Sequence, residues 1–85
     1  MEKSIFRIEY KTLLELLHEV RRRAGVTQVE LALRLNRTQA WVSKSEVGER
    51  RLDLLEVRDY VEALGLPFPE FVQQLEAALR DERQQ

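Results

Sequence analysis

The 85-residue chain has no cysteine, two prolines, three glycines, and one tryptophan and one histidine. Without cysteine, a disulfide framework and a thiolate metal site are both excluded. Its apolar runs are too short for a membrane span, and its N-terminus lacks the long apolar stretch of a signal peptide. We therefore expect a cytoplasmic protein that has no membrane association, metal or cofactor.

The composition favours a folded domain over a disordered chain, since 44% of residues are hydrophobic and 34% are charged. A second core would not fit in so short a chain, so we expect one domain over residues 1–85. Apolar residues recur at helical spacing, and no alternating run is long enough for a strand. The sequence thus predicts an all-α fold with helices at residues 8–24, 27–35, 39–47, 54–64 and 69–81.

Local signals mark the helix boundaries. Thr27 with Glu30, and Asp53 with Glu56, have the spacing of capping boxes. Asn36 follows the second helix and tolerates the left-handed conformation that a tight turn needs. The buried side of the fourth helix is expected to consist of Leu54, Leu55, Val57, Val61 and Leu64.

Charge is distributed unevenly along the chain, although its net charge is only −1. Residues 21–51 contain eight basic and three acidic side chains, a net charge of +5, whereas residues 53–85 contain three basic and eight acidic ones, a net charge of −5. A clustered basic segment is typical of a surface that faces phosphate. The acidic segment is expected to face away from phosphate or toward a partner.

Residues 27–51 have the pattern of a helix-turn-helix, whose second helix enters the major groove of DNA. Residues 12–66 resemble the Cro and lambda-repressor-like domain of the XRE class of bacterial and phage regulators. The resemblance rests on Gln28, Ala32, Val42, Ser43, Lys44, Glu46, Gly48, Arg50, Arg51 and the segment 63–65. It implies a compact five-helix, lambda-repressor-like DNA-binding domain, with its motif at residues 28–47, that regulates transcription as a repressor.

The resemblance also implies which residues meet double-stranded DNA. The start of the third helix faces the bases through Gln39, Ala40 and Lys44, which are suited to adenine, a thymine methyl group and guanine respectively. For Trp41 two placements stay open, at the DNA backbone or over the join between the first and third helices. The expected contacts with the DNA backbone are Gln28, Arg37, Thr38, Ser43, Arg50 and Arg51.

Two further expectations concern the interior. The resemblance implies a partly buried structural ion pair between Arg21 and Glu46. Ser45 stands where the family usually has a large apolar residue, so either its hydroxyl bonds back to the Trp41 carbonyl or the site contains a small void. We expect Ser45→Leu to stabilise the fold by roughly 1 kcal/mol.

One such domain covers little DNA, so we expect a homodimer on palindromic sites with half-sites about one helical turn apart. The fifth helix, residues 69–81, is the candidate interface, and the patch Ile5-Phe6-Ile8 could extend it. Alternatively, both segments fold back on the core of their own chain. The expected dimer contacts are Phe71, Val72, Leu75 and Leu79.

An alternative function is that of an antitoxin or other protein-interaction module, which would bind a protein partner through its acidic C-terminal helix. An enzyme is not expected. His18 is the only histidine, and the sequence offers no Ser-His-Asp, paired-carboxylate or metal-ligand arrangement around it.

Overall fold

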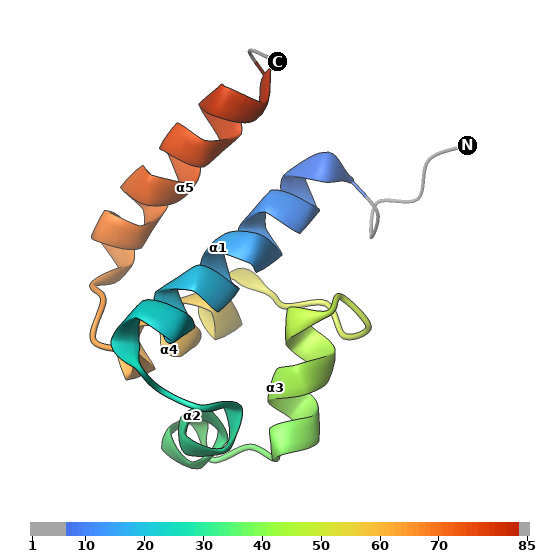
Figure 1. The fold of residues 1–85 in the computed structure, drawn as a ribbon, viewed down its shortest axis with the longest axis vertical. Helices are drawn as coiled ribbons and strands as arrows, with labels where there is room; N and C mark the ends of the chain where they lie inside the picture. Colours follow the sequence, from blue (N-terminus) through green and yellow to red (C-terminus); the bar gives the residue numbers. More distant parts are fainter. Residues whose placement is uncertain (1–6, 84–85) are drawn as a thin grey trace.

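The computed structural model describes residues 7–83, and within this range it contains five helices and no strand. Figure 1 shows α1 in the middle of the molecule, where it contacts α3, α4 and α5. The predicted all-α, five-helix fold is therefore confirmed. The helices are α1 (Ile8–Ala24), α2 (Gln28–Leu35), α3 (Gln39–Glu46), α4 (Leu54–Ala63) and α5 (Phe68–Arg83).

Both predicted capping boxes are present. The Thr27 hydroxyl accepts from the Glu30 N–H at 3.1 Å, and the Glu30 carboxylate accepts from the Thr27 N–H at 2.8 Å. The same reciprocal bonds join Asp53 and Glu56 at 2.8 and 2.9 Å. Between α2 and α3, Asn36 adopts a left-handed conformation with φ of 57°. The capping boxes begin α2 and α4, and Asn36 ends α2, so that three residues connect α2 to α3.

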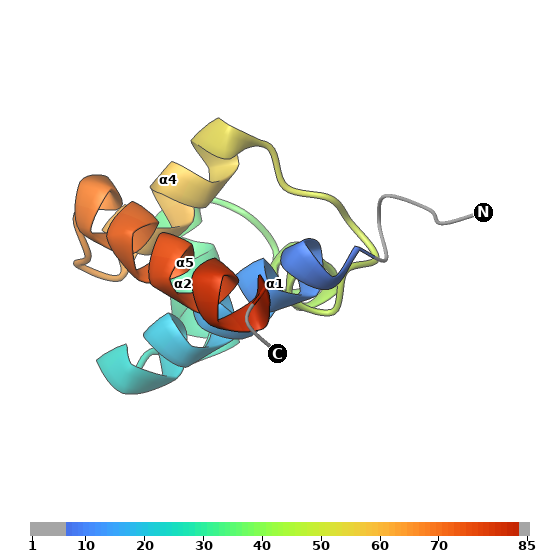
Figure 2. The ribbon, with the colours of Figure 1, turned by 90° about the horizontal axis from the view of Figure 1, so that it is seen from above.

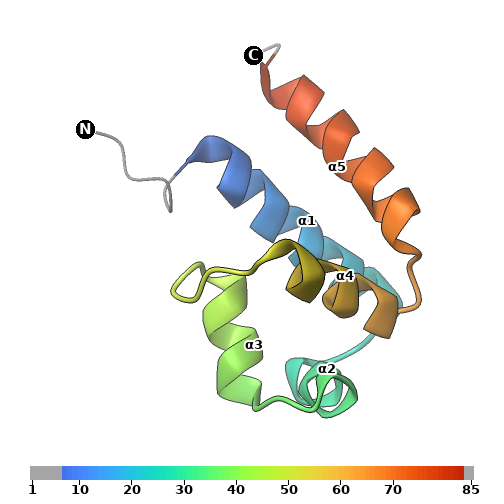
Figure 3. The same cartoon turned by 180° about the vertical axis from the view of Figure 1, so that it is seen from behind.

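The core forms where α1 packs against α3, α4 and α5 and where α2 packs against α3 and α4. From α1 it receives every third or fourth residue, which is the spacing of one helix face. Figure 3 shows α4 next to the second half of α1, with α3 and α2 below them. Ala32 and Val42 are both buried where α2 contacts α3, and the small alanine permits a close approach there. The other buried apolar residues are Tyr10, Leu14, Leu17, Val20, Val26, Leu31, Leu52, Val57, Tyr60, Val61 and Phe71.

The predicted buried side of α4 is wrong at its first two positions. Leu54 and Leu55 are 68% and 61% exposed, whereas Val57, Tyr60 and Val61 are buried. Leu55 is two residues before Val57 and therefore lies on the opposite side of the helix, and Leu54 lies at the edge of the buried stripe in the first turn. Tyr60, which is not among the residues expected on the buried side, is completely buried.

The fifth helix packs on its own chain. Figures 1 and 2 show α5 alongside α1, and the Thr12 hydroxyl of α1 donates to the Glu82 carboxylate near the end of α5, so the two helices run antiparallel. Phe71 is completely buried in the core of its own chain and is not available to a second copy, which corrects its prediction as a dimer contact. Val72 is exposed, and Leu75 is partly buried against the core.

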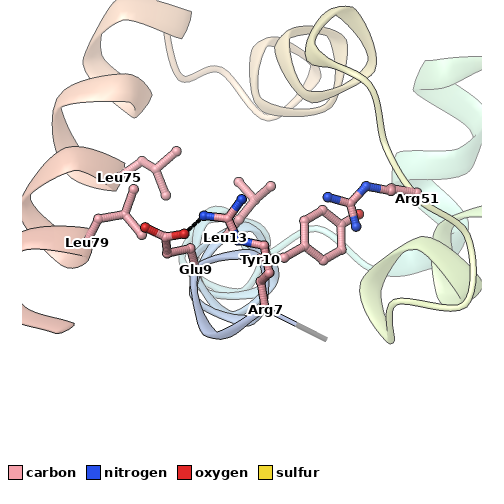
Figure 4. A pocket seen from close by; sticks show the side chains of 7 residues that line it. All are labelled: Arg7, Glu9, Tyr10, Leu13, Arg51, Leu75 and Leu79. Carbon is pink, nitrogen blue, oxygen red and sulfur yellow. Dashed lines mark ion pairs between the residues drawn. The ribbon is translucent and has the colours of Figure 1, made fainter. Parts of the chain in front are cut away.

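A cavity of about 300 Å³ opens between α1, α5 and the loop before α4. Figure 4 shows Leu75 and Leu79 of α5 on one side, Leu13 of α1 between the helices, and Arg51 on the far side of Tyr10. Arg7 and Glu9 form an ion pair at its edge. Of the predicted patch Ile5-Phe6-Ile8, Ile8 is exposed, and the other two residues lie outside the described range.

Ser45 is completely buried on α3, and its hydroxyl has no hydrogen-bond partner among the described residues. The expected bond to the Trp41 carbonyl is therefore absent. Ser45 differs from the family pattern, and its buried hydroxyl is unpaired. Such a group costs about 1–3 kcal/mol.

We expect Ser45→Ala to raise the stability by about 1 kcal/mol and the Tm by about 4–8 °C. Thermal denaturation followed by circular dichroism measures both. Ser45→Leu serves as the comparison, because it removes the same hydroxyl and also adds volume. A lower Tm for the alanine variant would show that the hydroxyl has a partner in solution, and a lower Tm for the leucine variant alone would show that the site has no spare space.

Candidate nucleic-acid interface

The side of α3 that faces solvent carries the residues predicted to read bases. Gln39, Ala40 and Lys44 are all exposed, whereas Val42 and Ser45 point into the core. Thr38 precedes the helix, and its hydroxyl accepts from the Trp41 N–H at 3.1 Å, so its side chain caps α3. Ser43 is half-buried. The start of α3 thus presents an amide, a methyl group and, one turn on, an ammonium group on one accessible surface.

Gln28 connects this surface to the interior. Its Nε2 donates to Glu46 Oε1 at 3.0 Å, and its Oε1 accepts from Gln39 Nε2 at 3.4 Å. One N–H of Gln39 is used in this bond, and its carbonyl oxygen and second N–H remain for a ligand. This is the acceptor and donor pair that matches an adenine edge.

Arg21 and Glu46 form a two-pronged ion pair between α1 and α3. Nε of Arg21 donates to one carboxylate oxygen at 2.7 Å, and Nη2 donates to the other at 3.0 Å. The side chains are 12% and 5% exposed. Arg21 also donates to the Val26 carbonyl at 2.9 Å. This pair joins the first helix to the end of α3 and thereby helps to set the position of α3.

The sequence did not reveal a further partner in this cluster, the Tyr60 hydroxyl of α4, which also donates to Glu46. Burial alone would raise the pKa of the Glu46 carboxyl, but hydrogen bonds from Arg21, Tyr60 and Gln28 outweigh burial and lower the pKa to about 2. Burial, followed by the hydrogen bond to Glu46, raises the pKa of Tyr60. At neutral pH the cluster therefore contains an ionised carboxylate and a protonated phenol.

Trp41 contacts two arginines that are predicted to bind phosphate. The guanidinium carbons of Arg37 and Arg50 are 4.7 and 4.8 Å from the centroid of its ring. Arg50 also pairs with Glu56 of α4 at 2.9 Å. Stacking of this kind restricts the rotamers of both arginines. Two basic groups, one before α3 and one after it, are thereby brought to the same tryptophan.

Arg51 is positioned by another aromatic residue. Its guanidinium carbon lies 4.3 Å from the centroid of the Tyr10 ring (Figure 4), and the Tyr10 hydroxyl accepts from the Leu52 N–H at 3.1 Å. Tyr10 belongs to α1, so the loop between α3 and α4 is fixed to the first helix. The predicted DNA contacts lie on α3 or on the segments that flank it, except Gln28, which begins α2 and is bonded to Gln39 of α3.

Residues 7–83 contain neither a candidate metal site nor a candidate membrane-spanning helix. No group of three or more His, Cys, Asp or Glu side chains in this range could hold a metal ion. No helix among these residues is both long and apolar enough to cross a bilayer. His18 is exposed, with its Nδ1 3.6 Å from Glu46 at the edge of the ion pair.

Comparisons with known proteins agree with this geometry. The model of a family described as a helix-turn-helix domain matches residues 12–75. Among solved structures, the chain is similar to an XRE-family like protein from Pseudomonas syringae pv. tomato str. DC3000, with 48% sequence identity and a TM-score of 0.77 over 81% of this chain and 84% of that one. A comparison with curated proteins found no match.

Proposed function

Because the chain belongs to the XRE-like family of helix-turn-helix proteins, a family of DNA-binding transcription regulators, we propose that it recognises specific sequences in double-stranded DNA. We further propose that it is a non-enzymatic cytoplasmic repressor that binds palindromic sites as a homodimer. The observation that carries the proposal is the exposed edge of α3, where Gln39, Ala40 and Lys44 share one surface.

The arginines on either side of α3 are suited to contacts with the DNA phosphates. Arg37 precedes α3, and Arg50 and Arg51 follow it, so positive charge lies at both ends of the reading helix. Contacts with phosphate raise affinity for any sequence and make it dependent on salt, whereas contacts with base edges discriminate between sequences. The arrangement supports both roles on one face of the protein.

Selection of bound sequences from a random duplex library, at roughly physiological salt, tests the proposal. We expect an enriched inverted repeat with half-sites about one helical turn apart. Enrichment of a single half-site would retain sequence-specific binding and reject the dimer. Failure of a folded protein to enrich any motif would reject sequence-specific binding itself.

The dimer requires an exposed apolar face, and α5 and α4 each offer one. One lies on α5 and consists of Val72 with the partly buried Leu75 and Leu79, and the other consists of Leu54 and Leu55 on α4. Analytical ultracentrifugation of Val72→Glu and Leu55→Glu assigns the interface, since only the variant whose face is used should become monomeric. Dimers that persist in both variants would exclude both faces.

A second candidate function is that of an antitoxin or another protein-binding module. The observation that favours it is the negative charge of α5, where Glu70, Glu76 and Asp81 are exposed. A basic protein partner would bind there without covering α3. Co-purification of one defined partner, lost when these three acidic residues are changed to their amides, would support this role.

A further inference from the structure

We infer that Glu56 acts as an internal substitute for a DNA phosphate, occupying Arg50 and Arg37 in the free protein and yielding them when a duplex binds. This inference rests on the proposed function, because it concerns the same basic surface. It assigns a role in DNA affinity to an acidic residue outside the helix-turn-helix motif.

The geometry around Glu56 is that of a bound oxyanion. Arg50 donates to it from two nitrogens, with Nη2 at 2.9 Å from Oε2 and Nη1 at 3.2 Å from Oε1. Nη2 of Arg37 is 4.0 Å from the same Oε2 atom. A planar guanidinium binds carboxylate and phosphate oxygens in the same two-pronged manner. A phosphate on the outer side of these arginines would therefore compete with Glu56 for the same donors.

The exposure of the three side chains places the arginines between Glu56 and solvent. Arg37 and Arg50 are 45% and 36% exposed, whereas Glu56 is only 17% exposed. Both guanidinium groups also lie against the Trp41 ring, which limits their movement away from this position. A DNA phosphate can thus approach the arginines from outside without first displacing another part of the chain.

Glu56 itself is fixed to the start of α4. Its Oε1 accepts from the Asp53 N–H at 2.9 Å, so it cannot follow the arginines toward DNA without breaking the capping box. The pairing with Arg50, and then the bond from Asp53, lower the pKa of the Glu56 carboxyl, which keeps it charged at neutral pH. Part of the positive charge is therefore already neutralised, and each phosphate that binds there must compete with a carboxylate.

The substitution Glu56→Gln isolates this effect, because glutamine at the third position of a helix can keep the capping box while losing the charge. We expect its affinity for a duplex of random sequence to rise roughly threefold to tenfold, and the slope of log K against log salt to steepen by about 1. Fluorescence anisotropy of a labelled duplex across a salt series measures both. The matched control is Glu62→Gln, which removes the same charge from the exposed side of the same helix.

Several outcomes would overturn the inference. An equal gain in Glu56→Gln and Glu62→Gln would mean that only net charge matters. A loss of affinity in a folded Glu56→Gln protein would mean that Glu56 organises the arginines for DNA instead of competing with it. In an Arg50→Ala background the gain from Glu56→Gln should largely vanish, and a gain that persists in full would also contradict the inference.

Two further measurements deal with a variant that does not fold and with a wild-type protein that does not bind DNA. If thermal denaturation shows that Glu56→Gln is unfolded, Glu56→Asp replaces it, since its shorter carboxylate reaches the arginines less well and should raise affinity in the same direction. If the wild-type protein binds no duplex even at low salt, the proposed function fails. That result differs from wild-type binding that Glu56→Gln leaves unchanged, in which case only the inference fails.

Discussion

Glu46→Ala is expected to destabilise the protein by about 3–5 kcal/mol, because it leaves a buried arginine without its counter-charge. Only 12% of the Arg21 side chain is exposed, and its other hydrogen bonds among the described residues are to the Val26 carbonyl and, more weakly, to His18. The Tyr60 hydroxyl and the Gln28 amide would lose their acceptor in the same substitution. The cost is thus shared by α1, α2 and α4, all of which meet at this carboxylate.

Thermal denaturation measures this effect, and a loss of this size corresponds to a fall in Tm of more than roughly 12 °C. The control is Glu49→Ala, which removes an exposed glutamate from the neighbouring loop and should leave the Tm almost unchanged. An unchanged Tm in Glu46→Ala would show that the ion pair contributes nothing to the folded state. Glu46→Gln, which keeps the shape and loses the charge, should fall between the wild type and the alanine variant.

The same carboxylate makes stability depend on pH in the acid range. Its folded-state pKa is depressed from 4.5 to about 2. A depressed carboxyl pKa adds stability that is fully present above the unfolded value and is lost as the pH falls from about 4.5 toward 2. Glu46→Gln should therefore be less stable than the wild type at neutral pH, and the difference between them should shrink across this window.

Local signals predicted most of the fold. Helix ends follow from neighbouring residues, and so the capping boxes at Thr27 and Asp53 and the turn at Asn36 could be identified from the sequence. The failures involve contacts between distant segments. The sequence does not predict Tyr60 as a partner of Glu46, because which hydroxyl meets a carboxylate depends on how α4 is placed relative to α3. Phe71 was assigned to a dimer because its periodicity cannot show whether the same chain or another one covers it.

The candidate interface likewise has features that the sequence predicts and features that only the structure shows. The positions of Gln39 and Lys44 on an exposed helix face follow from the motif and its register. The grouping of Arg37, Arg50 and Glu56 around Trp41 does not, because it unites the α2–α3 turn, the α3–α4 loop and the start of α4. A charge count along the chain even separates Glu56 from the basic segment that it neutralises. Electrostatic partners between elements therefore require the structure.

Gln39→Ala is expected to reduce affinity for the selected DNA sequence by roughly 5- to 150-fold, corresponding to the 1–3 kcal/mol of a good bidentate base contact. The bond from Gln39 to Gln28 directs one N–H inward and leaves the carbonyl oxygen and the other N–H for adenine. Affinity for a random duplex should be almost unchanged. Gln73→Ala, an exposed glutamine on α5, is the matched control.

Salt dependence separates this role from a contact with the DNA backbone. Gln39 carries no charge, so its removal releases no additional counterion and should leave the slope of log K against log salt unchanged. Lys44→Ala should also lower affinity for the selected sequence, but with a shallower slope if its ammonium group neutralises a phosphate as well. Equal losses on selected and random duplexes in Gln39→Ala would place this side chain on the backbone. In that case sequence discrimination would have to come from Ala40, Lys44 or the shape of the DNA itself.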